Sequence, residues 1–346
     1  MLMSKIEAAE KVGFAVVVPA YNATDTLSDC IQAILSATRK PHEVIVFHDG
    51  LTDGIDQIAG LPTVKVISNP GRPVGPAKGR NAAARQTDCE ILVFVDADVL
   101  VAKDAFQILL AELAGDRQIL AAFGSYDQYP RVARRAALYA NLRHHWVHQN
   151  GEREAGTFWT GLGAVRARAF WSIGGFDESS GVEDIDLGTR LLRAGGRIRL
   201  VPEALGTHCK DWSVLLLWRT DIFRRAIPWA KHLASGDGIA GHLNGSSRER
   251  LSAVVAYLTV AAAAGCFLSN WCAVALVIFA TVYLYLNFGL FRLLLQRGGI
   301  SSMLCGIVLH LIYHIYASAV YASVTVGMHL RSSMRHVLHV TYVSRN

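Results

Sequence analysis

The sequence predicts an α/β protein with a mostly parallel sheet and helices on both faces, followed by interfacial helices and C-terminal transmembrane helices. Up to about Gly245, short apolar runs alternate with segments of helical periodicity, which is typical of strands joined by crossover helices. From Leu251 to Met328 the only charged residues are Arg292 and Arg297, as expected of a membrane region. With 346 residues, 52% of them hydrophobic, the chain can hold both parts.

The elements of the first half follow in order. Residues 13–19 are a continuous apolar run ended by proline, which is typical of a strand buried on both faces. Apolar side chains at helical spacing predict a helix over residues 27–35. Further strands are expected at residues 43–47 and 64–67, and a helix at residues 78–85. Such alternation predicts parallel strands and a ligand crevice at their carboxyl ends.

The next strand, residues 91–95, presents two carboxylates at its carboxyl end, Asp96 and Asp98. Two acids separated by one small residue supply hard oxygen ligands for a divalent cation, and such a cation commonly also binds nucleotide phosphates. The turns after the strands at residues 13–19 and 43–47, which hold Tyr21 and Asp49, are expected at the same edge of the sheet. The pattern therefore predicts a metal and nucleotide site.

Charge and cysteine content narrow the partners and the compartment. The net charge of +6 suits an anionic membrane surface or a phosphate-bearing substrate, and beside the apolar C-terminal half we expect no nucleic-acid partner. The six cysteines show no Cys-x-x-Cys spacing, so we expect free thiols in a reducing compartment. Residues 1–12 lack an apolar core, and we expect no signal peptide.

Six motifs follow one another along the chain: Val16–Asn22, His48–Asp53, Gly79-Arg80-Asn81, Asp96-Ala97-Asp98, Gly174–Asp177 and Glu183-Asp184. In their order and spacing they resemble the motifs of the family 2 inverting glycosyltransferases, whose catalytic domain has the Rossmann-like GT-A fold. The resemblance covers roughly residues 13–210.

The resemblance implies roles on the donor side. Asp49 is expected to contact the base or ribose of a nucleoside-diphosphate sugar, and Asp96 its ribose or sugar. Asp98 is expected to be the main ligand of Mn²⁺ or Mg²⁺, which neutralises the departing diphosphate. His208 is expected to join the metal ligands, with a structural role as the alternative. The other donor-side candidates lie at a strand tip or a helix start, where anions bind: Pro19, Tyr21, Asn22, Lys78 and Arg80.

The pair Glu183-Asp184 opens a helix that is apolar on one face. The resemblance makes Asp184 the general base, which removes the proton of the acceptor hydroxyl opposite the leaving group. Stabilisation of the helix dipole alone would account for Glu183. The candidates for contact with the acceptor are Trp159, Thr160, Gly161, Glu183, Arg225 and Trp229.

Three apolar stretches, residues 251–268, 271–291 and 303–328, approach or exceed the roughly 20 residues of a membrane-spanning helix. The first two predict a hairpin whose basic flanks lie in the cytoplasm. The third either crosses the membrane or lies at its surface. His310 and His314 within it are expected to make hydrogen bonds between helices rather than to bind a metal.

This organisation gives four segments. Residues 1–210 are expected to form a cytoplasmic GT-A domain, and residues 211–250 an amphipathic interfacial helix and linker, because bulky apolar and basic side chains alternate there. Residues 251–330 are expected to hold two or three transmembrane helices, and residues 331–346 a basic tail. We therefore expect an integral protein of the cytoplasmic membrane. The sequence is compatible with either a monomer or a homo-oligomer.

The expected function is inverting transfer of a hexose from a nucleoside-diphosphate sugar to a hydroxyl of a membrane lipid or lipid-linked acceptor. A polyprenyl-phosphate glycosyl synthase is an alternative, although its ionised acceptor needs no base such as Asp184. A processive polysaccharide synthase is another, although Pro228 replaces the arginine before Trp229 in that group's Gln/Arg-x-x-Arg-Trp box. A non-catalytic membrane scaffold that binds a sugar-nucleotide is the last.

Overall fold

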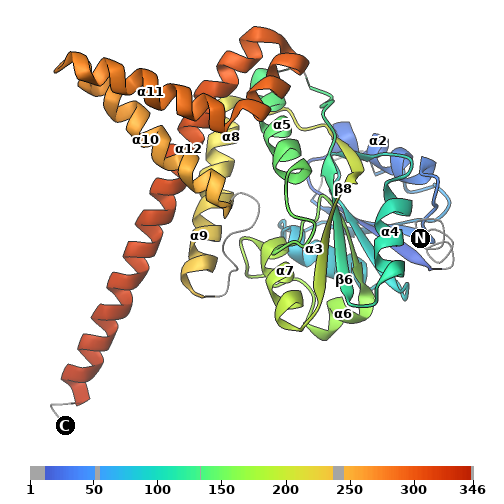
Figure 1. Ribbon diagram of the computed structural model, residues 1–346. Coiled ribbons are helices and arrows are strands. Elements are labelled where there is room, and N and C mark those ends of the chain that lie inside the picture. The colour runs from blue at the N-terminus through green and yellow to red at the C-terminus, as the bar shows by residue number, and fades with distance from the viewer. Residues whose placement is uncertain (1–11, 51–54, 133, 237–244, 344–346) are drawn as a thin grey trace.

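A computed structural model describes residues 12–50, 55–132, 134–236 and 245–343 (Figure 1). Residues 1–11, where no signal peptide is expected, lie outside the described residues. So do Leu51, Thr52 and Asp53 of the turn that follows Asp49.

An eight-stranded sheet has the order β3-β2-β1-β4-β7-β6-β8-β5. The strands β3, β2, β1 and β4 are parallel, whereas β7 pairs antiparallel with both β4 and β6. Beyond it, β6 and β8 are parallel and β5 pairs antiparallel with β8. The strands are β1 (Phe14–Ala20), β2 (Glu43–Asp49), β3 (Val64–Asn69), β4 (Ile91–Val95), β5 (Val99–Val101), β6 (Ile119–Tyr126), β7 (Leu162–Arg166) and β8 (Arg197–His208).

Helices cover both faces of the sheet, as the sequence predicts (Figure 1). Alternate residues of β1 belong to two separate cores: Val16 and Val18 pack with α2 and α4, and Ala15 and Val17 with α3, α6 and α7. This is the period-two alternation of a strand buried on both faces. The helices are α2 (Thr24–Ser36), α3 (Pro76–Ala84), α4 (Ala105–Gly115), α5 (Arg135–Gln149), α6 (Ala167–Ser172) and α7 (Glu183–Arg193).

The elements missed from the sequence lie in the second half of the sheet. Strands β5 and β6 were not expected, and β8 is unusually long, with 12 residues from Arg197 to His208. The long β8 is possible because it pairs with β6 along one part and with β5 along another. These pairings join segments far apart in the sequence, so local patterns carry little trace of them.

The C-terminal third begins with an almost continuous helix whose middle turn is π-helical, and it continues as a hairpin and one long helix (Figure 1). Helices α10 and α11 lie side by side, as the hairpin prediction requires. The elements are α8 (Val214–Thr220), the π-helical η1 (Asp221–Ala226), α9 (Ile227–Ala234), α10 (Ser247–Gly265), α11 (Asn270–Leu286) and α12 (Phe288–Val343).

The expectation of two or three transmembrane helices was wrong in number. Among the described residues one helix, spanning Phe288–Leu330 of α12, is long and apolar enough to cross a membrane. Helix α11 has only 17 residues, and the first turn of α10 consists mainly of charged residues. Both helices therefore have fewer than the roughly 20 apolar residues that a membrane crossing needs. Helix α12 is itself interrupted at Gly299, whose φ is 71°.

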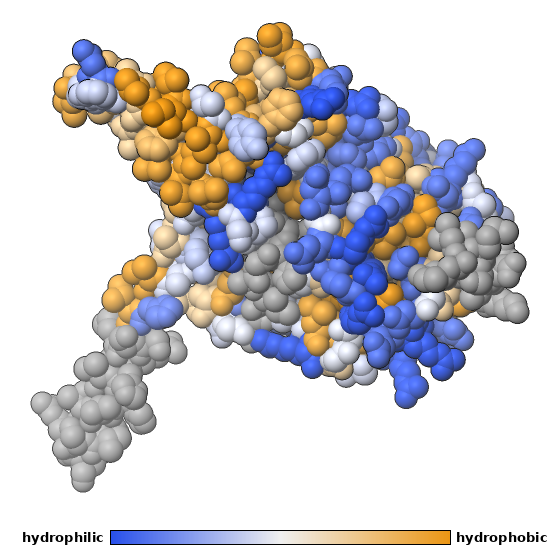
Figure 2. Space-filling view, in the orientation of Figure 1, coloured by the Kyte–Doolittle hydropathy of each residue, from blue (hydrophilic) through white to orange (hydrophobic). Residues whose placement is uncertain are grey.

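The hairpin nevertheless exposes much apolar surface. Orange, hydrophobic atoms gather on α10 and α11 in Figure 2, whereas the surface over the sheet is largely blue. At the hairpin tip Phe267, Leu268 and Trp271 are more than 80% exposed. Apolar patches of this kind mark surfaces that contact a membrane or another protein.

The two histidines of α12 join helices through hydrogen bonds, as expected. His310 bonds the Tyr139 hydroxyl at 3.0 Å and the Asn287 amide oxygen at 3.1 Å. His314 bonds the Tyr283 hydroxyl at 3.0 Å and the Glu249 carboxylate at 3.2 Å. Ligand atoms of Glu249 and both histidines lie within 4.8 Å of one another, but each ring nitrogen already has a partner. Tyr139 is on α5, so the network attaches α12 to the sheet domain.

Gly188 lets α7 lie directly against the backbone of residues 157–158. A Cβ there would be 2.5 Å from the Phe158 nitrogen and 2.8 Å from the Thr157 carbonyl carbon, and neither atom can rotate away. We expect Gly188→Ala to lower the free energy of unfolding by about 3 kcal/mol, measured by urea denaturation. In the control, Gly60→Ala, a Cβ meets nothing within 4 Å, and we expect a change below about 0.5 kcal/mol. Equal stabilities would contradict this packing.

Candidate active site

The carboxyl ends of β1, β2 and β4 meet at one edge of the sheet, where Asp96 and Asp98 follow β4. The Asp96 N–H donates to the Gly161 carbonyl at 3.3 Å, and the Asp98 carbonyl accepts from the Cys209 N–H at 2.8 Å. These two bonds fix the tip of β4 between the segment before β7 and the end of β8. The chain therefore holds both acidic side chains at the edge where parallel sheets bind ligands.

Arg80 joins the two halves of this site. Its side chain is 5% exposed, with Nη2 2.7 Å from Asp96 Oδ1 and Nη1 2.9 Å from Glu183 Oε1. Arg80 was expected among the cations that face a diphosphate, but its guanidinium lies buried between two carboxylates. Lys78, two residues earlier in α3, is exposed. A guanidinium suits this bridging position because its planar nitrogens donate to separate acceptors while its charge is retained.

Asp98 and His208 face each other. The distance from Asp98 Oδ2 to His208 Nε2 is 3.8 Å, beyond hydrogen-bond range. The His208 ring stacks on Tyr126 with centroids 4.2 Å apart. Burial, aided by Lys210 and Arg225, lowers the pKa of His208 to about 3, so its imidazole is neutral near pH 7. Burial and the charge of Asp96 raise the pKa of Asp98 to about 6.

This donor set fits a divalent cation. An ionised carboxylate and a neutral imidazole are the ligand types that Mn²⁺ accepts, and carboxylates also suit Mg²⁺. A cation beside Asp98 would also relieve the repulsion from Asp96 that raises its pKa. The structure thus brings together Asp96, Asp98 and His208, the donor-side acids and the imidazole expected from the sequence.

Asp184 lies in the first turn of α7, where its carboxylate accepts the N–H of Ile185 at 2.8 Å. Burial, followed by the charge of Glu183, raises the pKa of Asp184 to about 7, while Arg80 acts in the opposite direction. The charge of Asp96 also contributes to the rise, which places the two carboxylates in the same electrostatic neighbourhood. A carboxylate with a pKa near neutrality can take up and release a proton under physiological conditions.

The segment expected on the acceptor side packs around one aromatic ring. Trp159 lies 4.6 Å from the His144 ring and 4.9 Å from the Tyr126 ring, centroid to centroid, and Thr160 is buried. At Gly161 a Cβ would be 2.2 Å from the Trp159 ring. The absence of a side chain at Gly161 therefore makes room for the Trp159 ring.

Arg225 reaches toward the donor side from η1. Its Nη1 is 2.8 Å from Asp221 Oδ1, its guanidinium lies over Trp212 at 5.5 Å, and its side chain is 55% exposed. Asp221 is buried and also accepts from Arg143 at 2.9 Å and from the Tyr316 hydroxyl at 2.8 Å. The charge of Arg225 contributes to the low pKa of His208. Trp229, the other candidate of this region, is partly buried on α9.

The strand-tip candidates differ in exposure. Tyr21 is 57% exposed, and Asn22 has a left-handed φ of 51°, which turns the chain after β1. Asp49 is 5% exposed, and its carboxylate accepts the N–H groups of Val74 and Gly75 at 2.8–3.0 Å, so it anchors the loop before α3. Its contact with a base or ribose stays a prediction. Pro19, partly buried, ends the apolar run of β1.

Two residues of this region were not singled out from the sequence. Asn81 donates to the Phe176 carbonyl at 2.9 Å and accepts the Phe176 N–H at 3.0 Å, which fixes the loop before α7. The Tyr126 ring stacks on the His208 ring. The Gly-Arg-Asn motif was a signal for Asn81, whereas nothing in the local sequence marks Tyr126.

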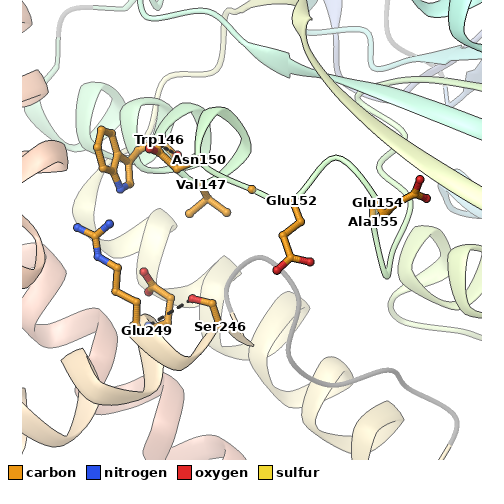
Figure 3. Close-up of a pocket in the computed structure, with 10 residues that line it drawn as sticks. Trp146, Val147, Asn150, Glu152, Glu154, Ala155, Ser246 and Glu249 are labelled. Atoms are coloured by element: carbon orange, nitrogen blue, oxygen red, sulfur yellow. Dashed lines mark hydrogen bonds between the residues drawn. The ribbon is translucent and has the colours of Figure 1, made fainter.

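A separate cavity of about 170 Å³ lies between the end of α5 and the start of α10 (Figure 3). Trp146 and Asn150 line it from α5, and Ser246 and Glu249 from the other side. None of the predicted site residues lines this cavity.

Comparison with known proteins supports this interpretation of the sheet edge. Residues 15–174 match the family described as Glycosyl transferase family 2. Over these residues the chain is similar to the glycosyltransferases of family 2. The matched residues include Asp96 and Asp98 and end before Asp184.

Two curated relatives match part of the chain. A pre-mycofactocin glycosyltransferase of Mycobacterium tuberculosis is 30% identical over 190 residues, which cover 49% of this chain and 39% of the relative. A validoxylamine A glucosyltransferase of Streptomyces hygroscopicus subsp. limoneus is 26% identical over 258 residues, covering 62% of this chain and 56% of the relative. The chain thus spans about half of the length of these relatives.

A solved structure shares the fold over most of the chain. The mannosyltransferase PcManGT from Pyrobaculum calidifontis, in complex with GDP-Man and Mn²⁺, superposes with a TM-score of 0.62 at 21% identity. The superposition covers 92% of this chain and 93% of that one. The likeness in fold therefore extends beyond residues 15–174 into the C-terminal helices.

Removal of the Arg80 guanidinium should destabilise the domain. In Arg80→Met, Asp96 and Glu183 would keep their charges without the buried partner, so we expect a loss of about 3 kcal/mol in unfolding free energy, measured by urea denaturation. Lys78→Met is the matched control on the same helix, and because Lys78 is exposed we expect a change within about 0.5 kcal/mol. Equal effects in the two variants would contradict the bridging role of Arg80.

Proposed function

We propose that this chain transfers a sugar, with inversion, from a nucleoside-diphosphate sugar to a hydroxyl of a membrane lipid or lipid-linked acceptor. The observation that carries the proposal is the bridge of Arg80, which holds the acid pair at the tip of β4 next to the carboxylates that open α7. Inverting transfer requires a donor site and a base on opposite sides of the reacting carbon, and the Arg80 bridge ties the candidate donor acids to the helix that carries the candidate base. The match of residues 15–174 to glycosyl transferase family 2 supports the same reaction type.

On the donor side, Asp98 and His208 would hold Mn²⁺ or Mg²⁺. When bound, the cation neutralises charge on the departing nucleoside diphosphate. Lys78 is exposed at the start of α3, and Arg225 is held by Asp221 near His208, so both cations can meet phosphate oxygens. Asp49 and Tyr21 mark the part of the crevice for the base and ribose, with Asp49 also fixing the loop that leads into α3.

On the acceptor side, Asp184 would accept the hydroxyl proton as the new bond forms. Its raised pKa matches the demand on a base that works near neutral pH. Glu183, tied to Arg80, would orient the start of α7, while Trp159 and Trp229 would bound the space for the acceptor. We further propose that α12 anchors the protein in the cytoplasmic membrane with the catalytic domain in the cytoplasm, because its apolar length suffices for one crossing.

Loss of the Asp98 carboxylate should weaken metal-dependent donor binding. For Asp98→Asn we expect the affinity for nucleoside diphosphate in the presence of Mn²⁺ to fall at least about tenfold, as for loss of one strong charged contact. Calorimetric titration of the purified chain with UDP and GDP, with and without Mn²⁺, measures this. Asp25→Asn, an exposed acid at the start of α2, is the control and should bind as the wild type. Identical affinities in both variants would refute the metal site.

The pH dependence of transfer should report Asp184. Its pKa is raised, so the base is ionised only above about pH 7, and kcat/KM should rise with pH through that value. Glu183→Gln removes a like charge, so the rise should move to lower pH. Asp184→Asn should cost at least about 100-fold in rate. The measurement is the rate of transfer from a radiolabelled donor to extracted membrane lipid between pH 5 and 9. A rate that does not change with pH, together with an active Asp184→Asn variant, would exclude Asp184 as the base.

A polyprenyl-phosphate glycosyl synthase is the second candidate. It would have an acceptor that is already ionised, so Asp184→Asn would retain activity and the product would be labile in mild acid. A glycoside formed at a hydroxyl resists that treatment. Product stability therefore separates the two reactions, and a long polymer product would instead identify a processive synthase.

A further inference from the structure

A groove of about 830 Å³ lies beside the start of α7, between the catalytic domain and the C-terminal helices. Its volume is within the range of sites that hold organic ligands. Three segments wall it: residues 179–182, which lead into α7; Pro228–Ser235 of α9 and its end; and residues 323–328 of α12. The wall from α12 belongs to the helix that is apolar enough to cross a membrane.

The groove adjoins the start of the helix that carries the proposed base. Val182, one of its lining residues, is the N-cap of α7 and lies two positions before Asp184. Helix α9 packs closely against this region, because a Cβ on Gly181 would lie 3.1 Å from Pro228. The Thr189 hydroxyl of α7 is also 3.4 Å from His232 Nε2 of α9. The groove is therefore enclosed by packed helices and begins two residues from Asp184.

The chemistry of the walls changes across the groove. The side formed by α12 contributes small or apolar residues, with Gly327 having open space where a Cβ would be. The side formed by α9 contributes the exposed Lys231 and the partly buried His232. No carboxylate is among the described residues that line the groove. The walls thus match a ligand with an apolar chain and an anionic group.

We propose that this groove binds the acceptor lipid, and that this lipid carries a phosphate between its apolar chain and the sugar that reacts. The chain would lie along residues 323–328 and the phosphate at Lys231 and His232, which brings the reacting hydroxyl to Asp184. This inference rests on the proposed function, because it names the class of acceptor used at the same site. It assigns Lys231 and Gly327 to acceptor binding.

The test is photo-crosslinking of the full chain in phosphatidylcholine nanodiscs with farnesyl phosphate that carries a diazirine at the end of its chain. We expect crosslinks in residues 323–328 or 179–182, competed by unlabelled farnesyl phosphate but at least about tenfold less well by farnesol or inorganic phosphate. Lys231→Ser should cut the yield about tenfold, as for loss of one charge-assisted contact, while Arg292→Ser, an exposed cation outside the groove, should not.

Gly327→Trp, which fills the groove, should abolish the crosslinks, and Gly327→Ala should keep them, with thermal unfolding confirming that both variants fold. Crosslinks confined to other segments, equal yields in Lys231→Ser and Arg292→Ser, or equal competition by farnesol would overturn the assignment. Transfer to lipid at the wild-type rate by Gly327→Trp would refute the groove and leave the proposed function standing. Groove crosslinks in a chain that transfers sugar to no lipid would refute the proposed function and support a phospholipid site.

Discussion

The structure depends on one buried guanidinium. Arg80 is almost fully enclosed and bonds a carboxylate at the tip of β4 and another at the start of α7. A buried cation of this kind is tolerated only when it is paired, so the two elements must approach it together. Asn81, the next residue, fixes the loop before α7 through the backbone of Phe176. Helix α3 thereby aligns the donor and acceptor halves of the site.

The same crowding of charges sets the chemistry. Burial, and then the charge of Asp96, raises the pKa of Asp98; burial, and then the charge of Glu183, raises that of Asp184. The first carboxylate thus suits the proposed cation and the second the proposed proton transfer. A second junction lies between the domain and the C-terminal helices, where the buried Asp221 accepts from an arginine of α5, from Arg225 of η1 and from a tyrosine of α12. Both junctions rely on a buried charge with several partners.

The sequence predicted the sheet edge well and the distant pairings poorly. Local runs of residues predicted the strand that ends at Val95 and the helix that begins at Glu183. The interhelical hydrogen bonding of His310 was also predicted, from its place in an apolar segment. The bridge of Arg80 joins residues 103 positions apart, so the motif around it gave no sign that it is buried. The antiparallel position of β7 between β4 and β6 is likewise a property of the assembled sheet. Hydropathy alone overcounted the spans, because it ignores where helices begin and end.

We propose that a cation at Asp98 lies opposite a base at Asp184, with the reacting sugar between them. Crystals of the full chain grown with Mn²⁺ and a non-transferable nucleoside-diphosphate sugar analogue, measured at the manganese absorption edge, would test it most directly. The account predicts an anomalous peak bonded to Asp98 and His208, with the Asp184 carboxylate facing the anomeric carbon from the side away from the diphosphate. A peak at another place, or an Asp184 side chain separated from the sugar by protein, would contradict it.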